Sequence, residues 1–363
     1  MQRAWDGIDP SQVWDSHSHL IGTGDSGSGI FVNPATDSLL SPGQYARRLF
    51  FLNAGCVHDA AAGSVDRAYV DRMRNLVDGM QRGGKVLLFA FERAYDERGE
   101  PDIAHTLFHI PDGYARDVAR QHPEYFEWAA SIHPYRKDAV QALEQAKRDA
   151  ARAVKWLPSA TGIDPASAKC DRFYEALNRL NLPLIAHAGL ERAVLGREAH
   201  DFGNPLRLRR ALDAGVRVVV AHCASMGEDR DLDRGPNGPY VESFSLFARL
   251  MGMPRYQNLL HGDISAMTQV NRAGPALARV VESDAWHARL LNGSDYPLPG
   301  VMPIFSVDYL VALKMLEASA AGVLREIRLH NPLLFDFVLK RTLRSNGKAL
   351  SAGVFQTRQF FMR

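Results

Sequence analysis

Residues 13–20 have the sequence VWDSHSHL, an apolar start that ends in two histidines one residue apart. In a β-strand, side chains at positions i and i+2 point to the same face. His17 and His19 are therefore expected to project together from a strand predicted over Gln12–His19. Burial and mutual repulsion both oppose charging two adjacent imidazoles. A shared metal ion explains such a pair.

Three further apolar runs end in a side chain that can bind metal. His187 follows the run LIA, His222 follows VVVA, and Asp295 follows LLNGS. The C-terminal ends of parallel strands meet at one face of a barrel. We therefore expect these three residues to lie near His17 and His19, and we interpret the five as one metal-binding constellation.

The whole chain alternates short β-rich apolar runs with longer segments of helical periodicity. The predicted strands are Gln12–His19, Lys85–Phe91, Phe126–His133, Arg152–Leu157, Pro183–His187, Val216–His222, Asn258–Ser265 and Leu290–Ser294. Predicted amphipathic helices include Val65–Gln81, Asp138–Ala151, Cys170–Leu180, Pro205–Ala214, Val241–Leu250 and Phe305–Glu317. Eight such units predict an α/β fold, a (β/α)8 TIM barrel in a single domain over residues 1–363.

A barrel of this kind needs roughly 250 residues, so about a hundred remain for loops and ends. Three long segments follow predicted strands: Gly22–Ser38, Phe91–Gly113 and Ala224–Tyr240. All three are expected at the C-terminal face of the strands, where such barrels place their active sites. The apolar tail Val354–Met362 is expected to dock on the barrel or on a second subunit.

The composition excludes several classes of protein. The net charge is +2 over 363 residues, which gives no electrostatic reason to expect nucleic acid or a membrane surface as partner. Three cysteines without CxxC spacing argue against a disulfide framework and fit a reducing cytoplasm. No signal sequence or membrane-spanning segment is predicted. A homodimer is the expectation from base rates alone.

Lys155 lies inside the apolar run AVKWLP of the fourth predicted strand. Lysine is almost never fully buried without a partner, so its place in a barrel strand needs a chemical reason. We interpret it as part of the same site.

These residues together resemble the amidohydrolase superfamily. Its pattern is HxH on strand one, often Lys or Glu on strand four, His on strands five and six, and Asp on strand eight. The matching positions here are His17, His19, Lys155, His187, His222 and Asp295. In phosphotriesterase- and dihydroorotase-like members, the strand-four lysine is carbamylated and bridges two metals. In amidohydrolase-2-like members one metal suffices, and the lysine binds a substrate carboxylate or pairs with an acid. The C-terminal His330-Asn331-Pro332 entering a helix favours the second subgroup.

The resemblance implies catalysis by a metal-activated water. His17, His19 and Asp295 would hold one divalent ion. In a two-metal site, His187 and His222 would hold the second ion. In a one-metal site, one of these two histidines would ligate the single ion and the other would polarise the substrate. Asp295, His222 and Lys155 are the implied catalytic residues. Zinc is the expected metal, with manganese, iron and nickel as alternatives. The expected reaction is hydrolysis of a lactone, ester, amide or phosphoester of a small substrate; the alternative is a decarboxylase or hydratase of a small carboxylate.

Substrate contacts are predicted from residues that follow the strands. The candidates are Glu92, Arg93, His133 and Tyr296. Arg93 and Lys155 together favour an anionic substrate. His261, Asp263 and Ser265 of the seventh strand form a second group of candidates, of which only alternate members should face inward.

Overall fold

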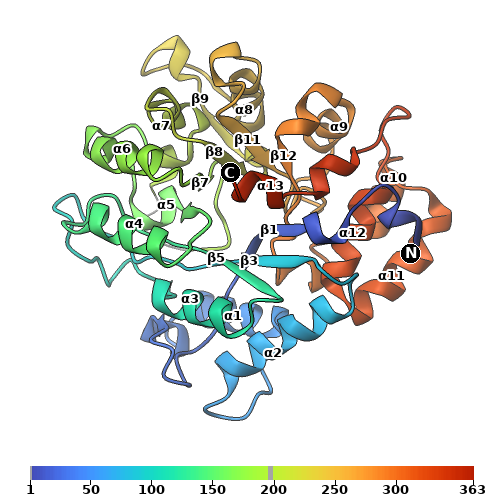
Figure 1. Ribbon diagram of the computed structural model, residues 1–363, viewed down its shortest axis with the longest axis horizontal. Helices are drawn as coiled ribbons and strands as arrows, with labels where there is room; N and C mark the ends of the chain where they lie inside the picture. The colour runs from blue at the N-terminus through green and yellow to red at the C-terminus, as the bar shows by residue number, and fades with distance from the viewer. Residues whose placement is uncertain (1, 195–198) are drawn as a thin grey trace.

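Eight parallel strands form the centre of the computed structural model, which describes residues 2–194 and 199–363 (Figure 1). Each strand falls within its predicted range. They are β1 (Trp14–His19), β3 (Lys85–Phe89), β5 (Phe126–Ala129), β6 (Val154–Trp156), β7 (Leu184–His187), β8 (Val218–Ala221), β11 (Leu260–Asp263) and β12 (Leu290–Leu291).

Backbone hydrogen bonds join these strands into a closed ring. One sheet has the order β1-β3-β5 and the other β12-β11-β8-β7-β6. A parallel bridge between Ala130 and Val154 links β5 to β6. On the other side, the Asp295 amide donates to the His17 carbonyl at 2.8 Å, and the His19 amide donates to the Tyr296 carbonyl at 2.9 Å. The strands therefore follow one another around a barrel in chain order, and the predicted fold class is confirmed.

The interior of the barrel is a separate apolar cluster. It contains Trp14, Leu87, Phe89, Ala129, Ala153, Ile185, Val219, Leu291, Phe360 and Phe361. The last two belong to α13 (Arg358–Phe361), which lies over the middle of the strands in Figure 1. The tail therefore docks on the barrel, where its two phenylalanine rings pack against side chains that point inward from the strands.

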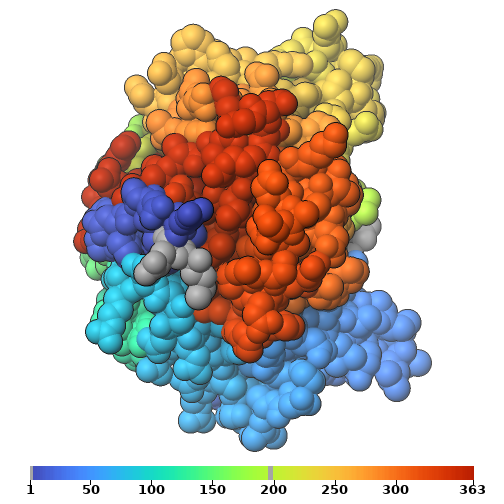
Figure 2. Space-filling model, turned by 90° about the vertical axis from the view of Figure 1, so that its right-hand side faces the viewer, coloured from blue at the N-terminus to red at the C-terminus, as the bar shows by residue number. Residues whose placement is uncertain are grey.

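The helices surround the ring, with their apolar faces against the strands. Their bounds are α1 (Pro42–Ala54), α2 (Val65–Asp78), α3 (Asp112–Gln121), α4 (Ala139–Arg148), α5 (Pro158–Thr161), α6 (Asp171–Arg179), α7 (Arg209–Asp213), α8 (Ser243–Met251), α9 (Pro275–Glu282), α10 (Val307–Ala312), α11 (Ala318–His330) and α12 (Pro332–Thr342). Figure 2 shows the orange and red C-terminal helices covering one flank, above the blue segments of the N-terminal part.

The predicted helix Phe305–Glu317 is wrong in its extent. The Ser306 hydroxyl accepts a bond from the Tyr309 amide and starts α10, as an N-cap does. The helix ends at Ala312, and Lys314 adopts a left-handed conformation with φ of 58°. That conformation interrupts a right-handed helix, so the chain turns before α11 begins.

Two of the predicted long loops pair with each other. Strand β2 (Phe31–Val32) is antiparallel to β4 (Phe108–His109), which joins the segment after β1 to the segment after β3. Buried Asp66 of α2 anchors the first of these segments by accepting the Thr23 amide at 2.7 Å. The third loop carries β9 (Glu228–Arg230), paired with β10 (Tyr240–Glu242). The β2–β4 pair contributes Val32 and Phe108 to the lining of a cavity.

Among the described residues, no helix is long and apolar enough to cross a membrane. Cys56, Cys170 and Cys223 are all free thiols.

Candidate metal centre

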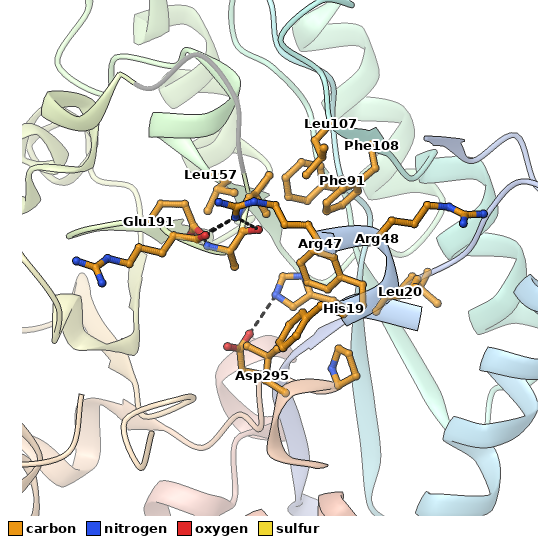
Figure 3. A pocket seen from close by; sticks show the side chains of 18 of the residues that line it. His19, Leu20, Arg47, Arg48, Phe91, Leu107, Phe108, Leu157, Glu191 and Asp295 are labelled. Carbon is orange, nitrogen blue, oxygen red and sulfur yellow. Dashed lines mark hydrogen bonds and ion pairs between the residues drawn. The ribbon is translucent and has the colours of Figure 1, made fainter. Parts of the chain in front are cut away.

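A cavity of about 640 Å³ opens at the C-terminal ends of the strands. The paired segments β2 and β4 supply part of its apolar wall, with Val32 and Phe108 among the lining residues. Figure 3 shows His19 and Asp295 side by side in this cavity, with the aromatic ring of Phe91 nearby. Polar and apolar surfaces therefore face each other across one space, as is typical of binding sites for small molecules.

Three of the predicted ligands form a tight cluster. His17, His222 and Asp295 each offer a ligand atom, and these atoms lie within 4.8 Å of one another. His19 adds a fourth, because its Nε2 is 3.1 Å from Asp295 Oδ1. The side chain of His19 is 29% exposed, whereas that of His17 is 1% exposed. His19 is thus the member of this group that faces the open cavity.

His187 and Lys155 lie on the opposite side of the cluster from β12. The ring of His187 is 5.4 Å from that of His222, and neither of its nitrogens has a hydrogen-bond partner among the described residues. Lys155 Nζ is 3.4 Å from His17 Nε2. All six residues predicted as ligands therefore line the same cavity.

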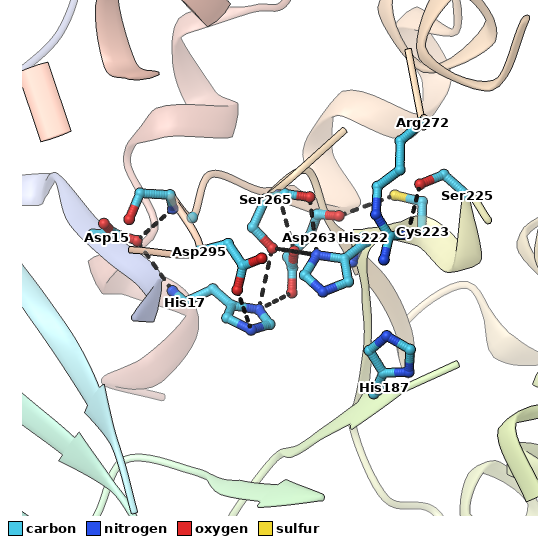
Figure 4. A network of polar contacts seen from close by, with 12 residues as sticks. Asp15, His17, His187, His222, Cys223, Ser225, Asp263, Ser265, Arg272 and Asp295 are labelled. Atoms are coloured by element: carbon cyan, nitrogen blue, oxygen red, sulfur yellow. Dashed lines mark hydrogen bonds and ion pairs between the residues drawn. The ribbon is translucent and has the colours of Figure 1, made fainter. Parts of the chain in front are cut away.

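Two residues of the seventh strand and its end orient the cluster (Figure 4). Asp263 Oδ2 is 2.9 Å from His17 Nδ1. Ser265 Oγ is 2.8 Å from His222 Nδ1 and 3.1 Å from His17 Nδ1. With Nδ1 engaged, each ring keeps Nε2 for a metal. His261, two residues earlier on the same face, lies at the other end of the barrel beside Phe360.

The protonation states suit metal binding, which requires neutral histidines and ionised carboxylates. Burial lowers the pKa of His17 to about 4 and the pKa of His187 to about 3, so both rings carry a free lone pair at neutral pH. Burial alone would raise the pKa of Asp295, but His222 and the contact with His19 hold it well below its usual range. Burial lowers the pKa of Lys155 to about 8.

The backbone is strained where it presents the ligands. His222, Cys223 and Ala224 all have φ between 50° and 54°, and Asp295 has φ of 61°. Such left-handed conformations cost of order 1–3 kcal/mol each in a residue other than glycine. Gly293 allows the close passage of β12 beside β1, since a Cβ there would lie 2.5 Å from the Cβ of His17.

The donor set fits a divalent metal ion. Two imidazoles and a carboxylate whose ligand atoms lie within 4.8 Å of one another, with further imidazoles beside them, are the types of ligand that zinc and related ions prefer. Both nitrogens of His187 are buried and find no hydrogen-bond partner in the described part of the chain, which is costly unless a ligand satisfies them. His17, His19, His222 and Asp295 would hold the ion, with His187 and Lys155 at its edge.

The four predicted substrate contacts are placed elsewhere. None of them is among the described residues that line the cavity. Glu92 forms a buried ion pair with Arg136, at 2.5 Å. His133 is fully buried and lies 3.2 Å from the Thr161 carbonyl, Tyr296 is fully buried, and Arg93 donates its amide to Glu92. A substrate-binding role for these residues stays a prediction.

The sequence patterns did not reveal five charged residues that line the cavity: Arg47, Arg48, Glu191, Arg192 and Arg272. Arg47 and Arg48 belong to α1, whereas Glu191, Arg192 and Arg272 lie in the loops that follow β7 and β11. Arg272 is 9% exposed, and its guanidinium donates to the Ser225 hydroxyl at 3.3 Å. Proximity to a predicted strand end was the one signal available for Glu191, four residues after His187.

With this geometry established, comparisons with known proteins define the family. The chain belongs to the amidohydrolase family, whose sequence profile matches residues 14–333. The resemblance found in the sequence is thereby confirmed. The protein is an enzyme of a superfamily that acts on small molecules with the help of divalent metals. No curated protein shows significant sequence similarity to it.

Several solved structures resemble the chain at low sequence identity. An uncharacterised TIM-barrel protein, Bb4693 from Bordetella bronchiseptica, is 15% identical with a TM-score of 0.51, over 89% of this chain and 99% of that one. A 2-pyrone-4,6-dicarboxylic acid hydrolase, described as putative, from Pseudomonas putida is 14% identical (TM-score 0.46, 97% and 98% covered). The manganese-containing 5-carboxyvanillate decarboxylase LigW2 from Novosphingobium aromaticivorans is 10% identical (TM-score 0.48, 98% and 99% covered).

Proposed function

We propose that this protein is a metal-dependent hydrolase that cleaves a lactone, ester, amide or phosphoester bond of a small substrate with a metal-activated water. The observation that carries the proposal is the cluster of His17, His222 and Asp295 at the base of a large cavity. A divalent ion held there, most suitably zinc, supplies a water whose pKa is lowered to roughly 7.

The protein's own groups supply the proton transfer. Asp295 Oδ1 is ionised and lies within 3.5 Å of both His17 Nε2 and His19 Nε2. It can accept a proton from the attacking water and deliver it to the leaving group, as a general acid–base catalyst does. Of His187 and His222, one would ligate the single ion and the other would polarise the substrate. Ser265 engages Nδ1 of His222, which leaves its Nε2 for either role.

Lys155 is proposed to act as a carbamate. Its Nζ lies 3.4 Å from His17 Nε2, so a carboxylate added to it would reach the ligand cluster. The amine would attack carbon dioxide, form an N–C bond and release one proton. A carbamylated Lys155 would bridge a second ion held by His187 and His222. An unmodified Lys155 would instead bind a substrate carboxylate beside a single ion.

A second candidate function is a lyase that decarboxylates or hydrates a small carboxylate. The cations of the cavity favour it: Arg272 and Lys155 both line the space without an ion-pair partner within 4 Å among the described residues. A buried guanidinium binds a carboxylate well, because it offers a planar pair of donors. The same ligand cluster would serve either reaction.

The free thiols of the described chain suit a reducing compartment, and we propose that the enzyme acts in the cytoplasm. A homodimer is proposed from base rates alone. Cell fractionation and light scattering would test these two points separately.

Metal analysis tests the central proposal. Protein expressed with divalent metal and bicarbonate should contain about one or two equivalents of metal, and two should accompany a carbamate signal from ¹³C-bicarbonate in the NMR spectrum. Absence of metal after supplementation would refute the proposal. Asp295→Asn should retain metal and lose turnover on whichever lactone, phosphoester or carboxylate proves to be the substrate. Release of carbon dioxide from a carboxylate would identify the lyase instead.

A further inference from the structure

The side chain of Arg47 forms a strap across the cavity. Arg47 belongs to α1, in the segment that follows β1. Its Nη1 donates to the Arg192 carbonyl at 2.6 Å and to the Ala193 carbonyl at 3.2 Å, in the segment that follows β7. Figure 3 shows Arg47 between Glu191 and His19. One side chain therefore ties together two segments that are 145 residues apart in the sequence.

The strapped segment is folded around one carboxylate. Glu191 Oε1 accepts hydrogen bonds from the amides of Ala193, at 2.5 Å, and Val194, at 3.0 Å. These bonds occupy Oε1, and no backbone amide of the described residues donates to Oε2. The side chain of Glu191 is 9% exposed. Arg47 donates to carbonyl groups of this turn, and the amides of the same turn donate to Glu191.

The second oxygen of Glu191 faces His187. Oε2 lies 3.2 Å from His187 Nε2, although off the line of a straight hydrogen bond. No other described side chain hydrogen-bonds to the His187 ring. Metal-binding histidines usually have one ring nitrogen held by a carboxylate or carbonyl, and this partner fixes the direction of the other. Asp263 does this for His17, and Glu191 is the corresponding carboxylate for His187.

We propose that Glu191 is a positioning residue for His187 and that Arg47 holds Glu191 in place. The inference rests on the proposed function, because it assigns His187 to a metal. The contacts run from Arg47 to the turn at Arg192 and Ala193, from the turn to Glu191, and from Glu191 to His187. Metal binding at the base of the cavity is therefore coupled to a contact at its wall, more than a hundred residues away in the sequence.

The test is a double-mutant cycle in the full chain, read by Co²⁺ and Zn²⁺ affinity against a competing chelator. Glu191→Gln should weaken metal binding about tenfold or more, since outer partners of ligands contribute 10–100-fold. It should also shift the visible spectrum of the Co²⁺ form, which reports ligand geometry. Arg47→Met should act in the same direction. The double variant should bind metal no more weakly than Glu191→Gln alone, because both changes break the same chain of contacts.

Arg48 provides a matched control. It lies next to Arg47 and lines the same cavity, but it forms an ion pair with Asp37 at 3.1 Å instead of the strap. Arg48→Met should leave metal affinity and the Co²⁺ spectrum unchanged. Unchanged metal affinity in Glu191→Gln would overturn the positioning role. Additive effects of the Glu191 and Arg47 changes, or an equal effect of Arg48→Met, would overturn the coupling.

Amide exchange separates failure of this inference from failure of the proposed function. Absence of metal in the unaltered protein would refute the proposed metal-dependent function. The contact of Arg47 with the turn would then be tested by amide exchange alone. In metal-free protein, the amides of Ala193 and Val194 should exchange faster in Arg47→Met than in Arg48→Met. Equal exchange in the two variants would overturn the strap.

Discussion

Asp263 and His17 are joined by a buried contact of 2.9 Å between Oδ2 and Nδ1, and both side chains are 1% exposed. The aspartate also accepts the His222 amide at 3.1 Å through its other oxygen. One carboxylate thus sets the direction of one candidate ligand and fixes the backbone of another. It is the outer partner on which the cluster depends.

Asp263→Asn should therefore weaken metal binding while leaving the barrel folded. An amide keeps the size of the carboxylate but lacks its charge, so we expect the metal dissociation constant to rise 10–100-fold. Chelator competition measures the change, and circular dichroism checks the fold. Asp284→Asn, at an exposed aspartate, is the control. A dissociation constant within twofold of the unaltered protein would show that Asp263 is dispensable.

Asp66 should control the mobility of the cavity wall. Its carboxylate accepts the Thr23 amide and the hydroxyls of Ser26 and Ser28 at 2.6 to 3.0 Å. Removal in Asp66→Ala leaves these donors without their partner, at a cost of roughly 1–3 kcal/mol for each one that stays buried. We expect faster amide exchange over residues 22–32 and lower turnover. Asp66→Asn should have a smaller effect on exchange and turnover, because its side-chain oxygen can still accept a hydrogen bond. Unchanged exchange in the alanine variant would contradict this role.

A buried ion pair supports the closure of the barrel. Lys340 Nζ is 2.7 Å from Asp336 Oδ2 and donates to the Gly293 carbonyl at 2.6 Å, with both side chains 1% exposed. Lys340→Met leaves a carboxylate buried without its partner and should lower the free energy of unfolding by about 3–5 kcal/mol. The double variant Asp336→Leu with Lys340→Met should recover much of this loss. Urea unfolding measures the free energy of unfolding of each variant. A double variant less stable than Lys340→Met alone would contradict the prediction.

Asp112 predicts a pH dependence of stability. Burial raises its pKa to about 7, while the Ser131 amide donates to it at 2.8 Å. The unfolded side chain has a pKa near 3.9, so the folded state binds the proton more tightly. Its contribution is present below about pH 4 and is lost as the pH rises to about 7. Asp112→Asn should therefore be more stable than the unaltered protein at pH 8, and the difference should shrink toward pH 4.

The comparison is made by denaturant unfolding at several pH values. Asp117→Asn changes a half-exposed aspartate of the same helix and should show no such trend. A stability difference for Asp112→Asn that does not vary between pH 4 and pH 8 would contradict the prediction.

The strands and the ligand cluster could be predicted from sequence because both follow local rules. An apolar β run with a polar residue at its tip places that residue at one face of a barrel, and His17, His187 and His222 all obey this rule. Every predicted strand was confirmed. The register within each strand also decided which of its residues point inward.

The remaining site residues depend on long-range contacts that have no local pattern. Asp263 was correctly predicted to lie in the seventh strand, among candidates for its inward face. Its contact with His17, 246 positions away, has no local sequence signal. Arg47 and Glu191 meet through a turn after β7 that carries no periodicity. The pairing of β2 with β4 joins two segments that the sequence shows only as loops.

The two phenylalanines of α13 restrict how substrate enters and product leaves. Phe360 and Phe361 fill the end of the barrel away from the cavity, so the described side chains close the axis of the strands at that end. Substrate and product must share the opening above His19, and each turnover must clear that opening before the next molecule enters. An unreactive analogue of the product that occupies this opening would therefore compete with the substrate.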